Sequence, residues 1–129
     1  MPSEFVKEVA DVFAKDGPLS KVTANYTPRP SQIEFATSVA EALEKGKTLV
    51  AEAGTGTGKT FAYLVPALLK DQKVLISTAG KTLQDQLFTK DIPALLKALG
   101  MGCRVALLKG RSNYICKQRF CLLYTSDAA

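Results

Sequence analysis

The 129-residue chain contains little cysteine, and its apolar residues never form a long uninterrupted run. Its three cysteines, Cys103, Cys116 and Cys121, are odd in number, which does not favour a disulfide framework. No run approaches the roughly 18 apolar residues of a membrane-spanning helix. Acidic residues among the first eleven positions exclude a secretory signal. These absences predict a cytoplasmic protein that is not associated with membranes.

The chain as a whole carries a net charge of +5, and acidic residues are missing altogether from positions 104–119. Five basic residues lie in this range: Arg104, Lys109, Arg111, Lys117 and Arg119. A basic segment of this kind suits a polyanionic partner such as nucleic acid. From charge alone, an ordinary solvated surface is an equally good interpretation.

The most informative stretch is Glu52–Thr60, which reads E-A-G-T-G-T-G-K-T. It has the A-x-x-x-x-G-K-T form of a phosphate-binding loop, with alanine in place of the usual first glycine. Closely spaced glycines let the backbone turn tightly and present its N–H groups to an anion. A helix that starts near Gly58 adds its unpaired N–H groups and the positive end of its dipole. The predicted ATP-binding residues of the loop are Ala53, Gly54, Thr55, Gly56, Thr57, Gly58, Lys59 and Thr60.

Two residues of this loop are predicted to act in catalysis. Lys59 would reach the β- and γ-phosphates, and the Thr60 hydroxyl would hold Mg²⁺. The alternative interpretation is a flexible Gly/Thr linker. The flanking segments favour the nucleotide site, because an apolar strand-like segment (47–52) precedes the loop and an apolar helical one (61–69) follows it.

The pattern of apolar residues divides the rest of the chain into helices and strands. Helices are expected at 3–15, from a Ser31–Glu34 capping box to Gly46, at 61–69 around an unexplained Pro66, at 82–89 and at 92–99. Buried strands are expected at 47–52, 73–77 and 104–108. Alternating strands and helices indicate a parallel sheet with right-handed crossovers. The predicted fold class is therefore α/β, a truncated three-layer α/β/α nucleotide-binding domain.

Three further stretches narrow the choice among the reactions that phosphate-loop proteins catalyse. Y-T-P-R-P-S-Q occupies 26–32, I-S-T-A-G-K-T-L-Q-D-Q-L occupies 76–87, and L-K-G-R-S-N-Y-I-C occupies 108–116. Together with the phosphate loop, they resemble the N-terminal part of the iron–sulfur superfamily 2 DNA helicases of the XPD/DinG group, over roughly residues 22–120. The resemblance implies a RecA-like motor domain and an ATP-dependent helicase. It also implies 5′–3′ movement on single-stranded DNA and a role in DNA repair.

The same resemblance assigns roles to individual residues. Gln32 matches the glutamine that reads the adenine edge, whereas its structural alternative is a polar residue inside the capping box. Ser77, Thr78 and Lys81 match the motif that contacts the DNA backbone, and hydroxyl and ammonium groups suit phosphate contacts. Cys116 matches the first of four cysteines that hold a [4Fe-4S] cluster. A single matched cysteine cannot hold a cluster, and taken alone it would be a spare thiol.

The resemblance also divides the chain into parts. Residues 1–25 form an N-terminal helix and loop, 26–115 the first part of motor domain 1, and 116–120 the start of the iron–sulfur domain. Residues 121–129 leave the family pattern and match the translation of a transposon-end sequencing adapter at all nine positions. We therefore expect the native segment to end at or near Phe120; the alternative is a genuine C-terminal tail.

No D-E-A-H-like acidic box and no second motor domain occur in these 129 residues. ATP hydrolysis needs both. The acidic box holds magnesium and orients water, and the second motor domain supplies arginines. We therefore expect little or no ATPase or helicase activity from this chain by itself. Two alternative functions stay open at the level of sequence. One is a P-loop kinase or phosphotransferase, and the other is a non-catalytic nucleic-acid-binding module.

Overall fold

The computed structural model describes residues 1–127, and all of the regular secondary structure in that range is helical. The α-helices are α1 (Glu4–Val12), α2 (Pro30–Lys45), α3 (Lys59–Leu69), α4 (Lys81–Gln86), α5 (Ile92–Leu99) and α6 (Lys117–Asp127). Short turns of helix lie at η1 (Pro18–Lys21), η2 (Leu87–Asp91) and η3 (Arg111–Asn113), and η2 is π-helical. No helix within residues 1–127 is both long and apolar enough to cross a membrane.

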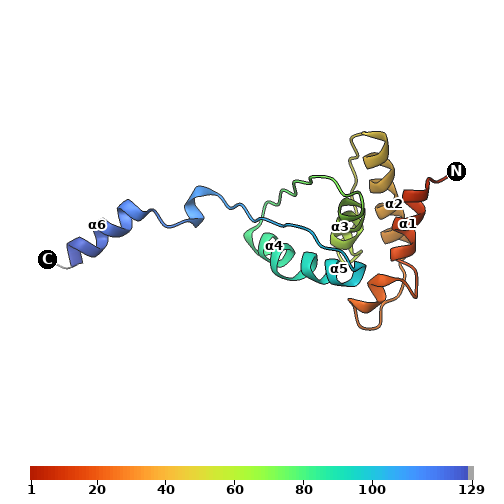
Figure 1. Ribbon diagram of the computed structural model, residues 1–129, viewed down its shortest axis with the longest axis horizontal. Coiled ribbons are helices and arrows are strands. Elements are labelled where there is room, and N and C mark those ends of the chain that lie inside the picture. Colours follow the sequence, from red (N-terminus) through yellow and green to blue (C-terminus); the bar gives the residue numbers. More distant parts are fainter. Residues whose placement is uncertain (128–129) are drawn as a thin grey trace.

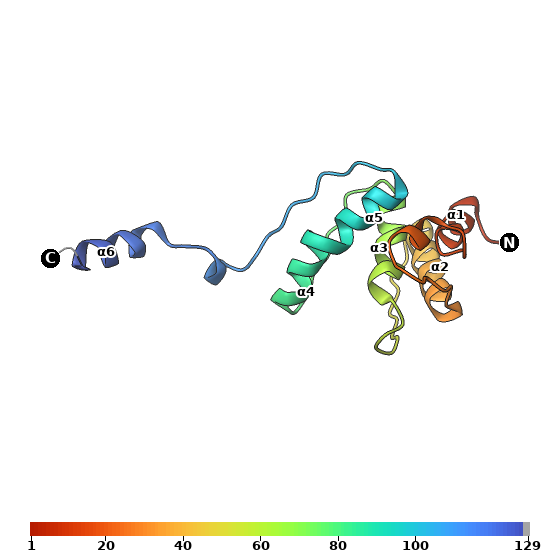
Figure 2. The same ribbon diagram turned by 90° about the horizontal axis from the view of Figure 1, so that it is seen from below.

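The helices form a compact body from which α6 stands apart (Figures 1 and 2). Helices α1, α2 and α3 pack together, and α4, η2 and α5 follow one another as one rod beside α3. Helix α6 lies at the end of an extended arm. Residues 121–127 of the predicted non-native segment 121–129 belong to this helix and therefore lie away from the body. Its last two residues, 128 and 129, lie outside the described range.

Local sequence explains where the first helix begins and ends. The Ser3 hydroxyl accepts a hydrogen bond from the Val6 N–H (3.2 Å), which caps α1. Valines at positions 6, 9 and 12 share the buried face. The chain turns away near Gly17, where a Cβ would come within 2.5 Å of the Asp11 carbonyl oxygen. The predicted helix at 3–15 is confirmed, with an end three residues earlier.

Helix α2 begins differently from the prediction. Its N-cap is Arg29, with Pro30 in the first turn, and the cap makes no side-chain hydrogen bond. The predicted Ser31–Glu34 capping box is therefore wrong, because the helix already starts at Pro30 and its N-cap lies two residues before Ser31. The predicted stop is confirmed. Gly46 adopts a left-handed conformation (φ 59°), and the Lys47 N–H donates to the Ala42 carbonyl at 2.9 Å.

The hydrophobic core lies between α1, α2, α3 and α5. Its largest fully buried side chains are Phe13, Leu19, Leu64, Leu95, Val9, Val65 and Pro66. Pro66 thus has a packing role, which the sequence did not reveal, and α3 continues through it to Leu69. The helix expected at 61–69 is confirmed as α3, and the helices expected at 82–89 and 92–99 are confirmed as the α4–η2–α5 rod.

The α/β fold class predicted from sequence is wrong for this structure. Within residues 1–127 no strand or sheet is present, so no three-layer arrangement forms. The segments 47–52, 73–77 and 104–108 instead run as irregular connections. Several of their apolar side chains face solvent, including Val50 (94% exposed), Leu75 (93%) and Leu108 (83%).

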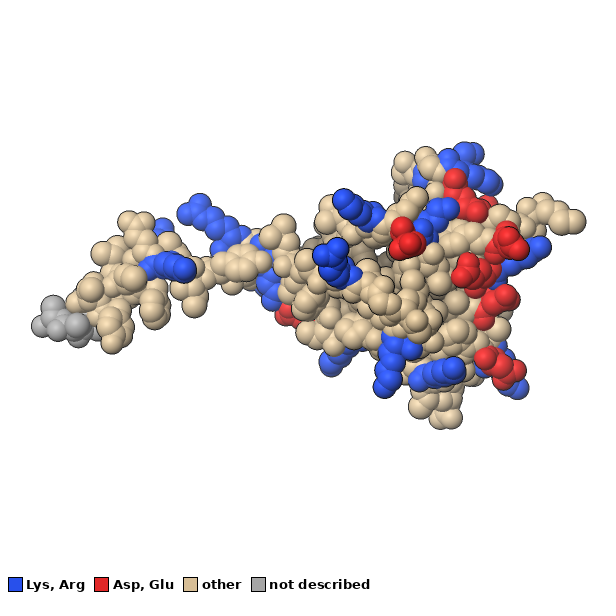
Figure 3. Space-filling model, viewed as in Figure 1, with Lys and Arg blue, Asp and Glu red and all other residues tan. Residues whose placement is uncertain are grey.

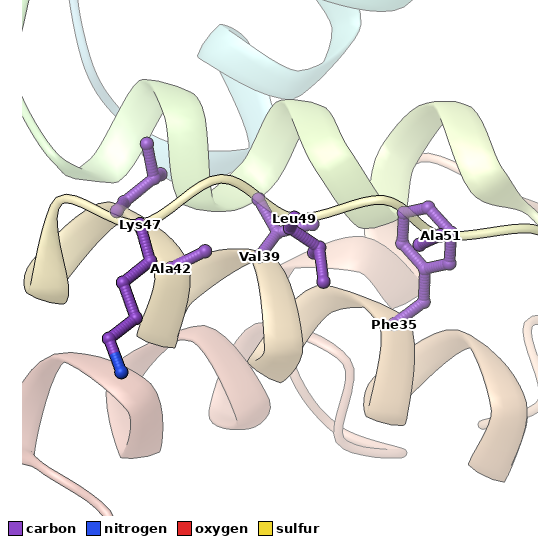
Figure 4. A pocket seen from close by; sticks show the side chains of 7 residues that line it. Phe35, Val39, Ala42, Lys47, Leu49 and Ala51 are labelled. Atoms are coloured by element: carbon purple, nitrogen blue, oxygen red, sulfur yellow. The ribbon is translucent and has the colours of Figure 1, made fainter.

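The physical reason for this error is that an apolar run does not specify a hydrogen-bonding partner. A strand is stable only beside another strand, and parallel pairing joins segments that are far apart in sequence. Here the helices bury their apolar faces against one another, and the connecting segments follow the helices. Segment 47–51, for example, runs along α2, where its residue Leu49 faces Val39 across a shallow pocket of about 320 Å³ (Figure 4).

A pair of leucine truncations tests this arrangement. Leu64→Ala should lower the free energy of unfolding by about 2–5 kcal/mol, because Leu64 is fully buried between the helices. Leu75→Ala should change it by less than about 0.5 kcal/mol, because Leu75 is solvent-exposed. Urea unfolding followed by circular dichroism measures both. Equal, large losses in the two variants would show that Leu75 is buried in solution and would contradict the helical arrangement.

Candidate nucleotide-binding site

The phosphate loop lies between α2 and α3, and two of its glycines have left-handed backbones. Gly56 has φ 76° and Gly58 has φ 77°, a region that residues with a Cβ rarely adopt. Gly58 is the N-cap of α3, so the helix begins at Lys59. The free N–H groups and the positive dipole end of α3 therefore face the loop, as an anion site requires.

Hydrogen bonds inside the loop close it on itself. The Lys59 ammonium Nζ donates to the Ala53 carbonyl at 2.8 Å, and the Thr57 hydroxyl donates to the Gly54 carbonyl at 2.8 Å. This contact of the predicted phosphate-binding lysine thus joins the last part of the loop, at Lys59, to its first part, at Ala53. A phosphate oxygen would be a stronger acceptor for this ammonium than a neutral carbonyl, because the hydrogen bond would join two charged groups.

Two side chains at the start of α2 donate hydrogen bonds to the backbone of the loop. Gln32 is almost fully buried (5% exposed), and its Nε2 donates to the Gly58 carbonyl at 3.0 Å. The Arg29 Nη1 donates to the Gly56 carbonyl. Gln32, predicted to read adenine, therefore lies against the loop backbone. Arg29 was not singled out from the sequence, although its place between two prolines, three residues before Gln32, was a usable signal.

Thr60, the predicted magnesium ligand, is the second residue of α3 and is half-buried. It lies one turn of α3 before Tyr63, whose phenol has a raised pKa. Burial raises the pKa of the Tyr63 phenol, the Thr60 hydrogen bond lowers it, and the charge of Asp91 raises it.

The predicted DNA-contacting residues lie at the start of α4. Ser77 and Lys81 are exposed, and the Thr78 hydroxyl donates to the Gly80 carbonyl at 3.3 Å. All three line a groove of about 1110 Å³ between α3, the α4–η2–α5 rod and the segments 71–80 and 101–110. Arg104, from the basic segment, lines the same groove. The structure therefore brings together two basic features that are more than twenty residues apart in the sequence.

Two contacts attach the basic segment to α4. The Lys109 ammonium pairs with the Asp85 carboxylate at 2.8 Å, and the Gln84 side chain donates to the Leu108 carbonyl at 2.9 Å. In Figure 3, acidic side chains gather over the N-terminal helices, whereas the arm toward α6 shows only basic ones. The charge asymmetry of the sequence is thus also an asymmetry in space.

Cys116 is exposed and lies just before α6, where its carbonyl accepts a hydrogen bond from the Phe120 N–H at 2.9 Å. The other two cysteines are also exposed. Over the described part of the chain, no three Cys, His, Asp or Glu side chains come together in a group that could hold a metal ion. These residues do not fit a [4Fe-4S] cluster, which needs several converging thiolates.

Residues 33–122, more than half of the chain, match the DEAD/DEAH box helicases, and the chain belongs to that family. It is 55% identical over 111 residues to the ATP-dependent DNA helicase YoaA of Escherichia coli K12, and 49% identical over 116 residues to YoaA of Haemophilus influenzae. It is also 49% identical over 98 residues to the ATP-dependent helicase DinG of Mycobacterium tuberculosis. The predicted resemblance to helicases of the DinG group is confirmed.

These matches cover most of this chain but little of its relatives. They include 86%, 90% and 70% of the chain, respectively. The chain spans 18% of the length of each YoaA protein and 15% of the DinG protein. The comparisons therefore concern a small part of a much longer helicase sequence.

The contact between Gln32 and Gly58 can be tested by adding one methyl group. A Cβ at position 58 would lie 2.2 Å from the Gln32 Nε2 atom, on a backbone with φ 77°. Gly58→Ala should therefore lower the free energy of unfolding by at least about 1–2 kcal/mol, measured without ligand.

Gly54→Ala is the matched control, because a Cβ there meets nothing within 4 Å and the backbone is not left-handed. We expect this variant to unfold within about 0.5 kcal/mol of the parent chain. The same small effect in both variants would mean that Gly58 does not adopt the left-handed conformation against Gln32.

Proposed function

We propose that this chain is the ATP-binding N-terminal part of an ATP-dependent DNA helicase. The observation that carries the proposal is the loop at 52–58, with two left-handed glycines at the N-terminus of α3 and a lysine directly after them. Membership of the helicase family supplies the reaction class. A P-loop kinase or phosphotransferase would share the loop but not this family.

In this proposal the loop residues hold the phosphates of ATP. Lys59 neutralises the β- and γ-phosphates, and Thr60 contributes its hydroxyl to Mg²⁺. The residues present fit a nucleotide, because backbone N–H groups, a helix N-terminus and an ammonium group converge on one loop. When bound, the nucleotide supplies the free energy of hydrolysis, and Gln32 contributes to adenine recognition as the family resemblance implies.

The groove beside α4 is the proposed path for single-stranded DNA. Ser77, Thr78 and Lys81 offer hydroxyl and ammonium donors along it, and Arg104 adds a second positive charge. Such groups bind phosphate oxygens without reading bases, which suits an enzyme that moves along DNA. We further propose 5′–3′ movement and a role in DNA repair in the cytoplasm. In the whole protein, Cys116 would supply one thiolate to a [4Fe-4S] cluster.

Replacement of Lys59 tests the nucleotide site. Lys59→Ala should weaken binding of an ATP analogue with a fluorescent ribose by about 10- to 100-fold, because a charge-assisted phosphate contact contributes about 1.5–3 kcal/mol. Fluorescence anisotropy in the presence of Mg²⁺ measures the affinity. Lys97→Ala, an exposed lysine on α5, removes the same charge and should leave the affinity unchanged. Equal affinities for the parent and Lys59→Ala would rule out this loop as the phosphate site.

Replacement of Lys81 tests the DNA path. Lys81→Ala should weaken binding of a short labelled oligothymidylate and reduce by about one the slope of log affinity against log salt concentration. The exposed Lys7, on the acidic side of the molecule, gives the control variant Lys7→Ala, for which no change is expected. Identical losses in both variants would mean that DNA binds through overall charge and not through the groove. A salt-sensitive affinity that ATP leaves unchanged would favour a non-catalytic binding module.

A further inference from the structure

The carbonyl groups of the two left-handed glycines of the phosphate loop both accept hydrogen bonds from side chains at the start of α2. The Gly58 carbonyl accepts from the Gln32 Nε2 at 3.0 Å and also from the Ala62 N–H at 3.2 Å, which is the first backbone hydrogen bond of α3. The Gly56 carbonyl accepts from the Arg29 guanidinium. The helix itself therefore orients the peptide after Gly58, whereas Arg29 holds the peptide after Gly56.

Holding a carbonyl also orients an N–H group. Across a trans peptide bond, the C=O of one residue and the N–H of the next point in opposite directions. No cis peptide bond occurs in the described part of the chain. Because the Gly56 carbonyl points toward the Arg29 guanidinium, the Thr57 N–H points away from that guanidinium. An orientation of this kind makes a loop N–H available to an anion.

The local sequence presents Arg29 for this contact. Pro30 restricts the preceding residue to an extended backbone, and Arg29 has φ −115° and ψ 119°. As the N-cap of α2, Arg29 makes no side-chain hydrogen bond to its own helix. Upstream, the Tyr26 hydroxyl donates to the Phe13 carbonyl at 2.8 Å, which attaches the segment before Arg29 to the end of α1. The Arg29 side chain therefore extends from a backbone segment that is attached to α1, and its guanidinium reaches the loop.

We propose that Arg29 is a positioning residue for phosphate binding, which holds the Gly56 peptide so that the Thr57 N–H faces the phosphate before the nucleotide arrives. The inference rests on the proposed ATP site at 52–60 and describes how that site is prepared. Preorganisation of this kind lowers the ordering cost of binding. Its effect is therefore the same for every ligand that has a chain of phosphates, whatever base is attached.

Two ligands separate loop positioning from base recognition. Isothermal titration of ATP and of inorganic triphosphate, each with Mg²⁺, measures both affinities in the parent chain, Arg29→Ala and Arg29→Lys. Arg29→Ala should weaken both ligands by the same factor, about 3- to 10-fold for one lost hydrogen bond. Arg29→Lys, which retains a donor, should recover part of the loss. A loss for ATP without a loss for triphosphate would mean that Arg29 contacts the base and would overturn the proposal.

The nucleotide-free protein supplies a second readout. Arg29→Ala should shift the NMR signals of the Gly56 carbonyl carbon and the Thr57 amide without any ligand, whereas Lys97→Ala should leave them unchanged. Unchanged signals in Arg29→Ala would mean that the arginine does not hold the loop, and would overturn the proposal. If the parent chain binds neither ATP nor triphosphate, the proposed ATP site fails, and the ligand-free signals still decide whether Arg29 holds Gly56.

Discussion

The packing of α2 against α3 is the constraint on which the candidate site depends. Ala36 and Ala40 of α2 and Ala62 of α3 are all fully buried, and such small side chains allow two helices to approach closely. This approach places the Gln32 Nε2 atom 2.2 Å from where a Cβ at position 58 would lie, so a larger residue there would have to displace the end of the Gln32 side chain. Helix packing and the left-handed backbone (φ 77°) therefore both disfavour a side chain at position 58.

The site combines parts that are ready for a nucleotide with parts that are not. The carbonyls of the left-handed glycines already accept hydrogen bonds from Arg29 and Gln32, and the N-terminus of α3 is already in place. Lys59, in contrast, donates to the Ala53 carbonyl. At the proposed site, binding of ATP would exchange this neutral partner for a charged one, which is favourable because charge-assisted hydrogen bonds are stronger. In the proposed site the loop backbone is thus held before a nucleotide arrives, whereas Lys59 must change its hydrogen-bond partner.

Much of this site was predictable from local sequence. The position of the loop followed from its glycines and the Lys59–Thr60 pair, and α3 lies where the apolar pattern placed it. The contacts of Arg29 and Gln32 with the loop were not predictable, because they join residues 26–27 positions apart. The resemblance to a family suggested that Gln32 belongs to the nucleotide site, but not that its amide would hold the loop backbone.

The sequence by itself determined the features that depend on neighbouring residues. These are the position of the phosphate loop, the end of α2 at Gly46 and the order of motifs that indicates the helicase family. Only the tertiary structure decided what the apolar segments 47–52, 73–77 and 104–108 do. Their composition favours burial, yet side chains such as Leu75 and Leu108 are exposed. The physical reason is that a strand requires a distant partner, whereas a helix satisfies its own backbone hydrogen bonds and needs only an apolar face to pack against.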